Sequence, residues 1–445
     1  MKNYKQNFKG KKITVMGLGL LGRGILYTKF LAECGEDLIV TDLKTKEQLA
    51  TSLKALEKFP NIKFVLGEHR LEDFRGRDMI MKAAGVPLDS IYIKEAKKNG
   101  IPVEMDVSLF AKTAPSIMII GVTGTRGKSM TTILIYEILK ANEKFLKKNV
   151  YIGGNLRGIA TLPLLKKVKD GDILVCELDS WQLQGFGEAK ISPHISVFTT
   201  FMPDHMNYYK DDMEKYFGDK ANIFKYHNKN DTLIILPDMK KWIKKEDIKS
   251  KLIVTDKKEV DAWKFNVKGD HHRNNLACAV KVAEVLGIPE IKIKKVVSKF
   301  EGLEGRLQLL KTYKGIKIYN DNNATTPEAT IAGIEALKSK KKNIILICGG
   351  ADKGLSLENF VKTVNENCKS AVMIPGTGTE RLITNYELRI KNEVGKDLND
   401  IVKSALSQTK KGDIILFSPA FASFGMFNNE YERNDLFMKI IKKLK

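Results

Sequence analysis

The chain contains few cysteines, few arginines and no long apolar run. Its five cysteines, Cys34, Cys176, Cys278, Cys348 and Cys368, form no CxxC pair. Their odd number argues against a disulfide framework, and we expect a reducing, cytoplasmic environment. No segment approaches the ~20 apolar residues that a transmembrane helix needs, so we expect no membrane insertion.

The first 22 residues carry a basic segment followed by an apolar one, as a secretory signal peptide does. Glycines and Arg23 interrupt the apolar segment, however, and no small-residue cleavage site follows it. We therefore interpret residues 13–16 as a first β-strand.

Only 11 of the 75 basic residues are arginines, which leaves 64 lysines and a formal net charge of +22. The lysines are spread along the chain, often beside glutamates, and do not gather into the arginine-and-aromatic clusters typical of nucleic-acid binding. We interpret them as a solvated surface with some attraction for polyanionic substrates, and we expect no nucleic-acid partner.

A length of 445 residues exceeds one ordinary core, and 43% hydrophobic with 29% charged residues is typical of a globular protein. Strand and helix patterns alternate in three blocks. We predict an α/β monomer of three consecutive domains: a Rossmann-like domain at 1–107, a central P-loop ATPase domain with a mainly parallel sheet at 108–303, and a Rossmann-like αβ domain at 304–445.

The most informative segment is IMIIGVTGTRGKS at 117–129, which a helical pattern follows. Its apolar run predicts a strand, and its glycines let backbone N–H groups face an anion at the helix start. Lys128 would reach the outer phosphates of a nucleoside triphosphate, and Ser129 would offer its hydroxyl to Mg²⁺. Val122 stands where the strict motif has glycine. The alternative is a glycine turn with a surface lysine, which the strand–loop–helix context disfavours.

The first block carries a second nucleotide signature. Strand 13–16 leads into Gly17-Leu-Gly19-Leu-Leu-Gly22, and a strand at 38–41 ends at Asp42. This fingerprint could hold NAD, FAD or another pyrophosphate-linked nucleotide. The run MIMKAAGVP at 79–87 predicts a further strand with a loop at Gly85, on the ligand edge of an open parallel sheet.

In the second block, a strand at 173–176 runs into Glu177, an acid beside the phosphate loop where proteins hold Mg²⁺. A strand at 195–200 leads to Asp204 and His205, and the helix predicted at 211–224 contains Lys220. The third block repeats the alternation, with strands at 316–320, 344–348 and 414–417 and a helix from Pro327.

Taken in order, these motifs resemble those of the Mur ligases. The matching motifs are the glycine fingerprint, TGTRGKS, GGN at 153–155, CELDSWQL, PDHMNYY, DKANIF, HHRNN, GLEGR, YNDNNATTPE, GGADKG and SPAFAS, and they span nearly the whole chain. The family comprises ATP-dependent amide synthases of cell-wall precursors, which activate a carboxylate as an acyl phosphate that an amine then attacks. The short first block and SPAFASFGMF most resemble the branch that adds D-glutamate to UDP-N-acetylmuramoyl-L-alanine.

The resemblance implies a catalytic set and a metal site. The catalytic residues would be Lys128, Glu177, His205 and Lys220, and Ser129, Glu177, His205 and Lys220 would serve two Mg²⁺ ions. Lys220 would be carbamylated by CO₂, which requires an uncharged amine and therefore a lowered lysine pKa.

The resemblance also implies three groups of binding residues. ATP would contact Gly124, Thr125, Arg126, Gly127, Lys128, Ser129, Asn275, Arg306 and Asp321. The UDP-linked muramyl precursor would contact Gly19, Leu20, Asp42, Lys44, Gly85, Asn155 and His205. The free amino acid would contact Thr325, Lys353 and Ser423. Plainer alternatives are a solvated surface for Lys220 and Lys353 and a helix cap for Asn275 and Asp321.

Several positions depart from the family pattern. Arginine at 126 and histidine at 272 each replace an asparagine, and the other departures are Asp179 for serine, Asn323 for lysine, Gly425 for aspartate and Glu430 for an aromatic residue. Losing a cation at 323 and gaining an anion at 430 weigh against a dicarboxylic amino acid. A sibling ligase with another amino acid or carrier therefore stays open.

Other classes of function also stay open. A folylpoly-γ-glutamate synthase shares the ATPase chemistry but not the N-terminal glycine fingerprint. A nicotinamide-dependent oxidoreductase would leave the phosphate loop, Glu177 and Lys220 unexplained. A nucleic-acid-stimulated ATPase and a degenerate ligase acting as a binding subunit are further alternatives.

Overall fold

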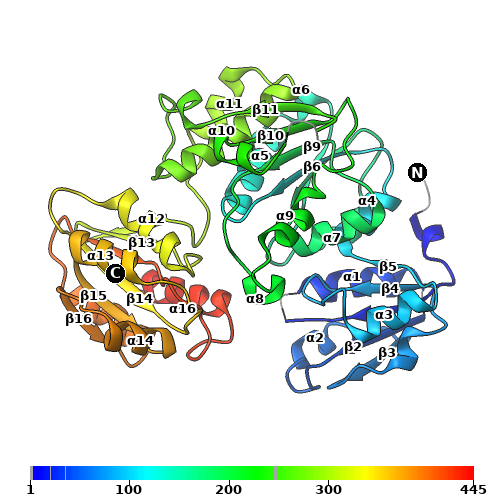
Figure 1. Ribbon diagram of the computed structural model, residues 1–445, viewed down its shortest axis with the longest axis horizontal. Helices are drawn as coiled ribbons and strands as arrows, with labels where there is room; N and C mark the ends of the chain where they lie inside the picture. Colours follow the sequence, from blue (N-terminus) through cyan, green and yellow to red (C-terminus); the bar gives the residue numbers. More distant parts are fainter. Residues whose placement is uncertain (1–3, 21, 36, 245–247, 445) are drawn as a thin grey trace. The chain divides into compact units, whose positions relative to one another are not determined.

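The computed structural model describes residues 4–20, 22–35, 37–244 and 248–444. The chain forms two compact units, one of residues 1–261 and 274–296 and the other of residues 262–273 and 297–445. Three sheets confirm the predicted α/β architecture: two lie in the first unit and one in the second (Figure 1). Among the described residues, no helix combines the length and apolarity needed to cross a bilayer.

The N-terminal domain has a five-stranded parallel sheet in the order β3-β2-β1-β4-β5. Its strands and helices are β1 (Lys12–Met16), α1 (Arg23–Glu33), β2 (Asp37–Asp42), α2 (Ala50–Lys54), β3 (Ile62–Leu66), β4 (Met79–Lys82), α3 (Ile91–Lys98) and β5 (Val103–Glu104). Successive strands are added on one side of β1 up to β3 and then on its other side from β4. The topological switch point therefore lies between β1 and β4, where open α/β sheets bind ligands outside the strands' carboxyl ends.

The middle domain has a six-stranded parallel sheet in the order β11-β10-β9-β6-β8-β7. Its strands are β6 (Met118–Thr123), β7 (Val150–Gly154), β8 (Ile173–Glu177), β9 (Ile195–Phe198), β10 (Thr232–Ile235) and β11 (Lys251–Val254). Its helices are α4 (Asp106–Thr113), α5 (Lys128–Ala141), α6 (Glu143–Leu146), α7 (Ser180–Ala189), α8 (Met206–Tyr209), α9 (Met213–Ala221), α10 (Asp270–Val285) and α11 (Glu290–Val297). The central strands are buried almost throughout, which explains their continuous apolar sequences.

The third domain has a six-stranded sheet in the order β12-β13-β17-β14-β15-β16, in which only the β12–β13 pair is antiparallel. The strands are β12 (Gln308–Tyr313), β13 (Ile316–Asn320), β14 (Ile344–Gly349), β15 (Cys368–Ile374), β16 (Lys391–Val394) and β17 (Ile414–Phe417). The helices are α12 (Pro327–Leu337), α13 (Glu358–Asn367), α14 (Thr377–Asn385), α15 (Leu398–Ser407) and α16 (Glu430–Lys442). Two apolar clusters pack on opposite faces of the sheet, one with α12, α13 and α14 and the other with α15 and α16.

Short 3₁₀ helices complete the described chain at Tyr4–Asn7, Leu71–Phe74, Leu162–Lys166, Pro237–Lys241 and Lys257–Glu259. The strands predicted at 316–320 and 414–417 are confirmed to the residue. The strand predicted at 195–200 ends at Phe198, because Thr199 and Thr200 leave the sheet to bond the phosphate loop. The limits placed at residues 107 and 303 stay a prediction.

Candidate functional site

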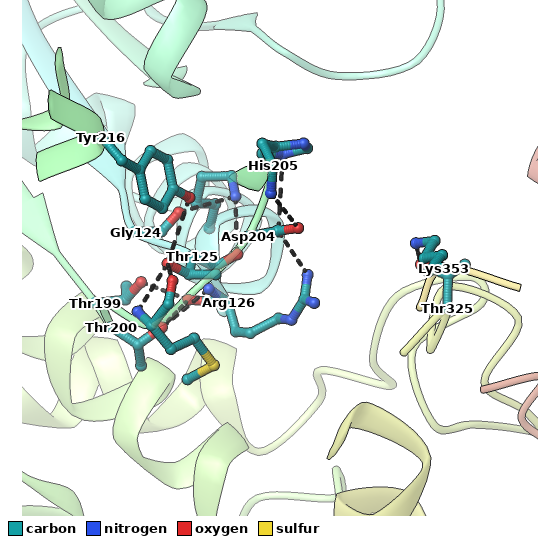
Figure 2. A network of polar contacts seen from close by, with 12 residues as sticks. Gly124, Thr125, Arg126, Thr199, Thr200, Asp204, His205, Tyr216, Thr325 and Lys353 are labelled. Carbon is teal, nitrogen blue, oxygen red and sulfur yellow. Dashed lines mark hydrogen bonds and ion pairs between the residues drawn. The ribbon is translucent and has the colours of Figure 1, made fainter. Parts of the chain in front are cut away.

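The phosphate loop is held by the segment that follows β9. The Thr125 N–H donates to the Thr200 carbonyl (2.7 Å), the Arg126 N–H donates to Thr200 Oγ1 (2.9 Å), and Thr199 Oγ1 donates to the Arg126 carbonyl (2.5 Å) (Figure 2). Two neighbouring strands, β6 and β9, thus fix the conformation of the loop between β6 and α5. These hydrogen bonds fix the backbone of the loop, as an anion-binding cradle requires.

Two glycines of this loop have no room for a side chain. Gly124 has φ +143°, and a Cβ there would lie 2.1 Å from Thr199 Oγ1. Gly127 has φ +89°, and its Cβ would lie 2.4 Å from Asn275 Oδ1. Asn275 lies inside α10, which begins at Asp270, so the helix-cap alternative for it is wrong. The structure therefore brings Asn275 to the predicted phosphate loop.

Two lysine ammonium groups converge on the Gly124 carbonyl. Lys128 Nζ donates to it at 3.0 Å and also to the Thr125 carbonyl at 3.1 Å, while Lys220 Nζ donates to it at 2.9 Å. Lys220 is only 1% exposed, and its Nζ lies 4.9 Å from the Tyr216 ring centroid. The alternative of a solvated surface lysine at 220 is therefore wrong.

Burial, with repulsion from a neighbouring cation, lowers the pKa of both lysines. Burial, and next the Lys128 ammonium, hold the pKa of Lys220 well below its usual value. Burial also lowers the pKa of Lys128, against the opposing attraction of Glu177. Lys220 is thus a buried amine that loses its proton easily.

Glu177 lies at the carboxyl end of β8, next to the phosphate-loop strand β6 in the register Val122↔Glu177. It is 4% exposed, and its backbone carbonyl accepts the Asn155 N–H at 2.7 Å. Arg23 at the start of α1 donates from Nη2 to Asn155 Oδ1 at 2.9 Å. Asn155 therefore links the first sheet's leading helix to the strand that carries Glu177.

His205 lies on the other side of the loop, where it precedes the short helix α8 in a left-handed conformation (φ +57°). Its ring packs on Trp181, with centroids 4.7 Å apart, and its Nε2 lies 3.7 Å from Asp204 Oδ2. Asp204 also pairs with Arg126, 3.3 Å from its Nη1 (Figure 2). Desolvation lowers the pKa of His205 and Asp204 opposes it, so the ring is neutral, the form that binds metals, at ordinary pH.

Within the part of the chain that the structure describes, no three His, Cys, Asp or Glu side chains gather into a metal cluster. Of the residues predicted to serve Mg²⁺, only Glu177 and His205 are of these types. A carbamate on Lys220 would supply two further carboxylate-like oxygens. The buried, readily deprotonated amine of Lys220 fits such a modification.

The first domain's glycine loop is organised by Asp42. Its Oδ2 accepts the N–H groups of Leu18 (2.9 Å) and Gly19 (3.0 Å), and its Oδ1 accepts the Lys44 N–H (2.9 Å). The predicted residues Gly19, Asp42 and Lys44 therefore lie together at the carboxyl ends of β1 and β2. Leu20 is half exposed beside them.

The third glycine of the fingerprint, Gly22, is the left-handed N-cap of α1, and a Cβ there would meet nothing within 4 Å. The close approach of helix and loop occurs instead at Gly24, where a Cβ would lie 1.9 Å from the Leu18 carbonyl oxygen. Sequence reasoning missed Gly24, although its place two residues after Gly22 was visible. At the β4 edge, Gly85 is exposed, as a ligand-facing loop requires.

In the second unit, all three predicted amino-acid-binding residues line one cavity of about 260 Å³. Lys353 Nζ donates to Thr325 Oγ1 at 3.2 Å inside it. The lining residues are Arg306, Asn323, Thr325, Lys353, Ala422, Ser423, Phe424, Glu430 and Tyr431. Asn323 and Glu430, two of the positions that depart from the family pattern, therefore line this cavity. Arg306, which the resemblance assigns to ATP, lines it as well.

Asp321 directly follows β13 and carries a buried carboxyl group. Its Oδ1 accepts the Leu307 N–H (3.0 Å) and its Oδ2 accepts the Ser418 hydroxyl (2.9 Å). It does not cap α12, whose N-cap is Thr326, so that alternative is wrong. Burial raises the pKa of Asp321 to about 7, against the opposing hydrogen bond of Ser418.

The remaining departures have plain local roles. Asp179 is the N-cap of α7 and accepts the Gln182 N–H at 2.7 Å, and Gly425 adopts φ +105°. His272 is buried against His271, with ring centroids 4.0 Å apart.

Sequence reasoning also missed a buried arginine on α16. Arg433 is 0% exposed and donates from Nε to Asn322 Oδ1 (2.8 Å) and from Nη2 to the Asn322 carbonyl (2.9 Å). Asn322 in turn donates to the Glu430 carbonyl at 2.9 Å. Burial lowers the pKa of Arg433 to about 10, and the group stays charged at neutral pH.

Comparison with known proteins matches three family descriptions along the chain. Residues 11–104 match "Mur ligase MurD-like, N-terminal domain", residues 122–299 match "Mur ligase middle domain", and residues 305–421 match "Mur ligase, glutamate ligase domain". Among solved structures, the fold is similar to that of the ligase MurC from Thermotoga maritima (TM-score 0.62, 17% identity, 98% of this chain and 100% of that one). It is also similar to MurF from Thermotoga maritima (TM-score 0.58, 18% identity, 100% of both chains).

Two relatives are UDP-N-acetylmuramoylalanine–D-glutamate ligases. The protein of Roseiflexus sp. (strain RS-1) is 33% identical and aligns with 97% of this chain and 98% of its own. The protein of Borreliella burgdorferi (strain ZS7) is also 33% identical, over 98% of each chain. With the loop, the buried Lys220 and the three sheets in place, these matches show that the chain belongs to the Mur ligase family.

Proposed function

We propose that this protein is an ATP-dependent ligase that joins D-glutamate to UDP-N-acetylmuramoyl-L-alanine. The observation that carries the proposal is the convergence of Lys128 and Lys220 on the Gly124 carbonyl, beside the buried Glu177. Two relatives of nearly full length bear the name of this activity.

The chemistry brings two anions together, the γ-phosphate and the substrate carboxylate. A site for this reaction needs fixed positive charge more than a nucleophilic side chain. Lys128 donates to loop carbonyls and lies where it can turn to the phosphates, and backbone N–H groups at the start of α5 face the same anion.

Mg²⁺ bound at this site would neutralise phosphate charge and orient the γ-phosphate for attack by the carboxylate. Ser129, Glu177, His205 and a carbamylated Lys220 are the residues that would hold it. Carbamylation joins the neutral Nζ of Lys220 to the carbon of CO₂ and releases one proton. The lowered pKa of Lys220 makes that neutral amine more available than an exposed lysine would be.

The charges of the third domain's cavity fit an amino dicarboxylate. Arg306 and Lys353 supply two cations and Glu430 one anion, while D-glutamate carries two carboxylates and one ammonium. The hydroxyls of Thr325 and Ser423 add hydrogen-bond donors. Glu430 therefore supports a dicarboxylic amino acid as the substrate. From the sequence alone, the negative charge at 430 had argued against one.

The test is phosphate release from ATP by the full-length protein with Mg²⁺ and UDP-N-acetylmuramoyl-L-alanine, across a panel of D- and L-amino acids. We expect release with D-glutamate and none without an amino acid. No release with any member of the panel contradicts the ligase, and preference for another amino acid contradicts the substrate.

A variant tests the cavity directly. Glu430→Gln should raise the KM for D-glutamate about 10-fold with a smaller change in kcat, because the ammonium loses its partner. Glu366→Gln, at an exposed glutamate on α13 that does not line the cavity, is the matched control and should leave both constants unchanged.

A further inference from the structure

Lys82 is a buried lysine that the proposed reaction does not use. It is the last residue of β4 and pairs with Met16, the last residue of β1, in the parallel register. It is only 1% exposed, and the three apolar residues before it are buried as well, although the loop that follows reaches the surface. A lysine is almost never fully buried unless its ammonium has partners.

The partners of this ammonium are three carbonyls of the loop that follows β4. Lys82 Nζ donates to Val86 at 2.8 Å and to Ala83 and Ala84 at 3.3 Å each. The side chain thus folds back toward its own loop, and one ammonium group is hydrogen-bonded to both ends of residues 83–86. The loop conformation depends on Lys82.

This loop lies at the switch point of the first sheet. The Ala83 N–H donates to the Met16 carbonyl at 2.9 Å, and a Cβ on Gly17 would lie 2.9 Å from the Ala83 Cβ. The loops after β1 and β4 therefore touch, at the place where an open parallel sheet binds its ligand. Gly85 at the loop tip is exposed.

Burial and the charged groups around Lys82 set its pKa close to neutral pH. Burial lowers its pKa to about 8, and Lys97 on α3 lowers it further. Asp179 at the N-cap of α7 and Asp219 on α9 act in the opposite direction. The ammonium is present at neutral pH and lost in alkaline solution.

We propose that Lys82 is a positioning residue for the uridine diphosphate: its three hydrogen bonds hold the 83–86 loop in the shape that the ligand contacts, and its charge favours the diphosphate. The inference rests on the proposed function only in taking a uridine nucleotide as the ligand of the first domain. Because a bound anion favours the ammonium, binding above pH 8 takes up a proton, and affinity falls as the pH rises.

The test is calorimetric titration of the full-length protein with UDP between pH 7 and pH 9.5. Phosphate groups are already ionised there, since their second pKa is about 6. We expect the affinity to fall at least about 5-fold over this range, with proton uptake near pH 9 visible as a dependence of the measured enthalpy on the buffer. A flat profile without proton uptake overturns the inference.

A variant separates positioning from simple folding. Lys82→Met should weaken UDP binding about 10-fold at pH 7 and flatten the pH profile, because three carbonyls lose a charged donor. Lys94→Met, an exposed lysine on α3, is the matched control and should behave as the unmodified protein does. Titration with ADP and Mg²⁺, whose predicted site lies in the middle domain, reports whether Lys82→Met is folded.

The outcomes distinguish the two proposals. Failure of the unmodified protein to bind UDP at any pH contradicts the proposed function itself. UDP binding that is indifferent both to pH and to Lys82→Met overturns only the role of Lys82. If Lys82→Met binds neither nucleotide, the pH profile of the unmodified protein decides.

Discussion

Among the residues that the structure describes, three long basic side chains are at most 1% exposed, and each is held by carbonyl or amide oxygens. Lys82 donates hydrogen bonds to three carbonyls of its loop, and Lys220 donates to the Gly124 carbonyl. Arg433 donates to the side chain and the carbonyl of Asn322. These hydrogen bonds all go to neutral oxygens. Desolvation is the largest effect on each group and outweighs the attraction of more distant carboxylates, so all three pKa values are lowered. Each of these groups fixes a loop next to a predicted ligand.

At the residue scale, the decisive prediction concerns Lys220. Lys220→Ala should lower turnover about 100-fold or more, because the site loses the group that would become a carboxylate-like metal ligand. Short-chain carboxylates such as acetate should restore part of the activity if the carbamate oxygens are what is missing. Phosphate release with and without added acetate measures both effects.

The matched control is Lys215→Ala on the exposed face of the same helix, α9. It should leave turnover unchanged. Full activity of Lys220→Ala contradicts the catalytic assignment, and loss of activity in Lys215→Ala to the same extent points instead to a damaged helix.

At the element scale, many of the predicted binding residues lie in loops at the carboxyl ends of strands, and the shape of these loops depends on neighbouring strands. Thr199 and Thr200, just after β9, hold the loop after β6, while Asp42, the last residue of β2, holds the loop after β1. In the third domain, Asp321 after β13 binds Leu307 and Ser418, which adjoin β12 and β17. One or two side chains from the end of an adjacent strand thus hold each loop.

Asp321 predicts a pH dependence of stability. Its pKa is raised to about 7 in the folded chain from an unfolded value near 3.9, so it favours the folded state fully below pH ~4 and loses this effect as the pH rises through 7. The loss amounts to about 4 kcal/mol at most, at 1.36 kcal/mol per pKa unit. Asp321→Asn, which cannot ionise, should show a smaller fall in Tm between pH 5 and pH 8.

Thermal unfolding of both proteins across this range measures the difference. Asp238→Asn, an exposed aspartate, serves as control and should follow the unmodified protein. Parallel pH profiles for Asp321→Asn and the unmodified protein would show that the carboxyl group is ionised in the folded chain at low pH.

The sequence predicted the elements well and the interior charges poorly. Strand–glycine–helix periodicity located the phosphate loop despite Val122, because the motif depends on backbone geometry that local sequence encodes. Lys82 was invisible, since a lysine after MIM at a strand end is as common on a surface as in a core. Arg433 and Gly24 were missed for a related reason: their contacts join segments far apart in sequence or depend on a helix–loop distance. The use of Glu430 could be judged only once the cavity showed which cations surround it.

At the scale of the whole molecule, the two nucleotide signatures should be separable by mutation. The uridine nucleotide is predicted at the switch point of the first sheet and ATP at the loop between β6 and α5, each organised by its own side chains. Lys128→Ala removes the ammonium that is predicted to reach the outer phosphates and leaves Asp42 and Lys82 unchanged. It should therefore bind UDP with unaltered affinity while releasing phosphate at least about 100-fold more slowly.

Calorimetry with UDP and a phosphate-release assay on the same preparation make the comparison direct. Lys144→Ala, an exposed lysine just beyond α5, is the matched control and should match the unmodified protein in both measurements. A parallel loss of UDP binding in Lys128→Ala would mean that the two sites depend on one shared structure. Unaltered phosphate release in Lys128→Ala would show that the Lys128 ammonium does not stabilise the transition state, because loss of such an interaction slows the reaction.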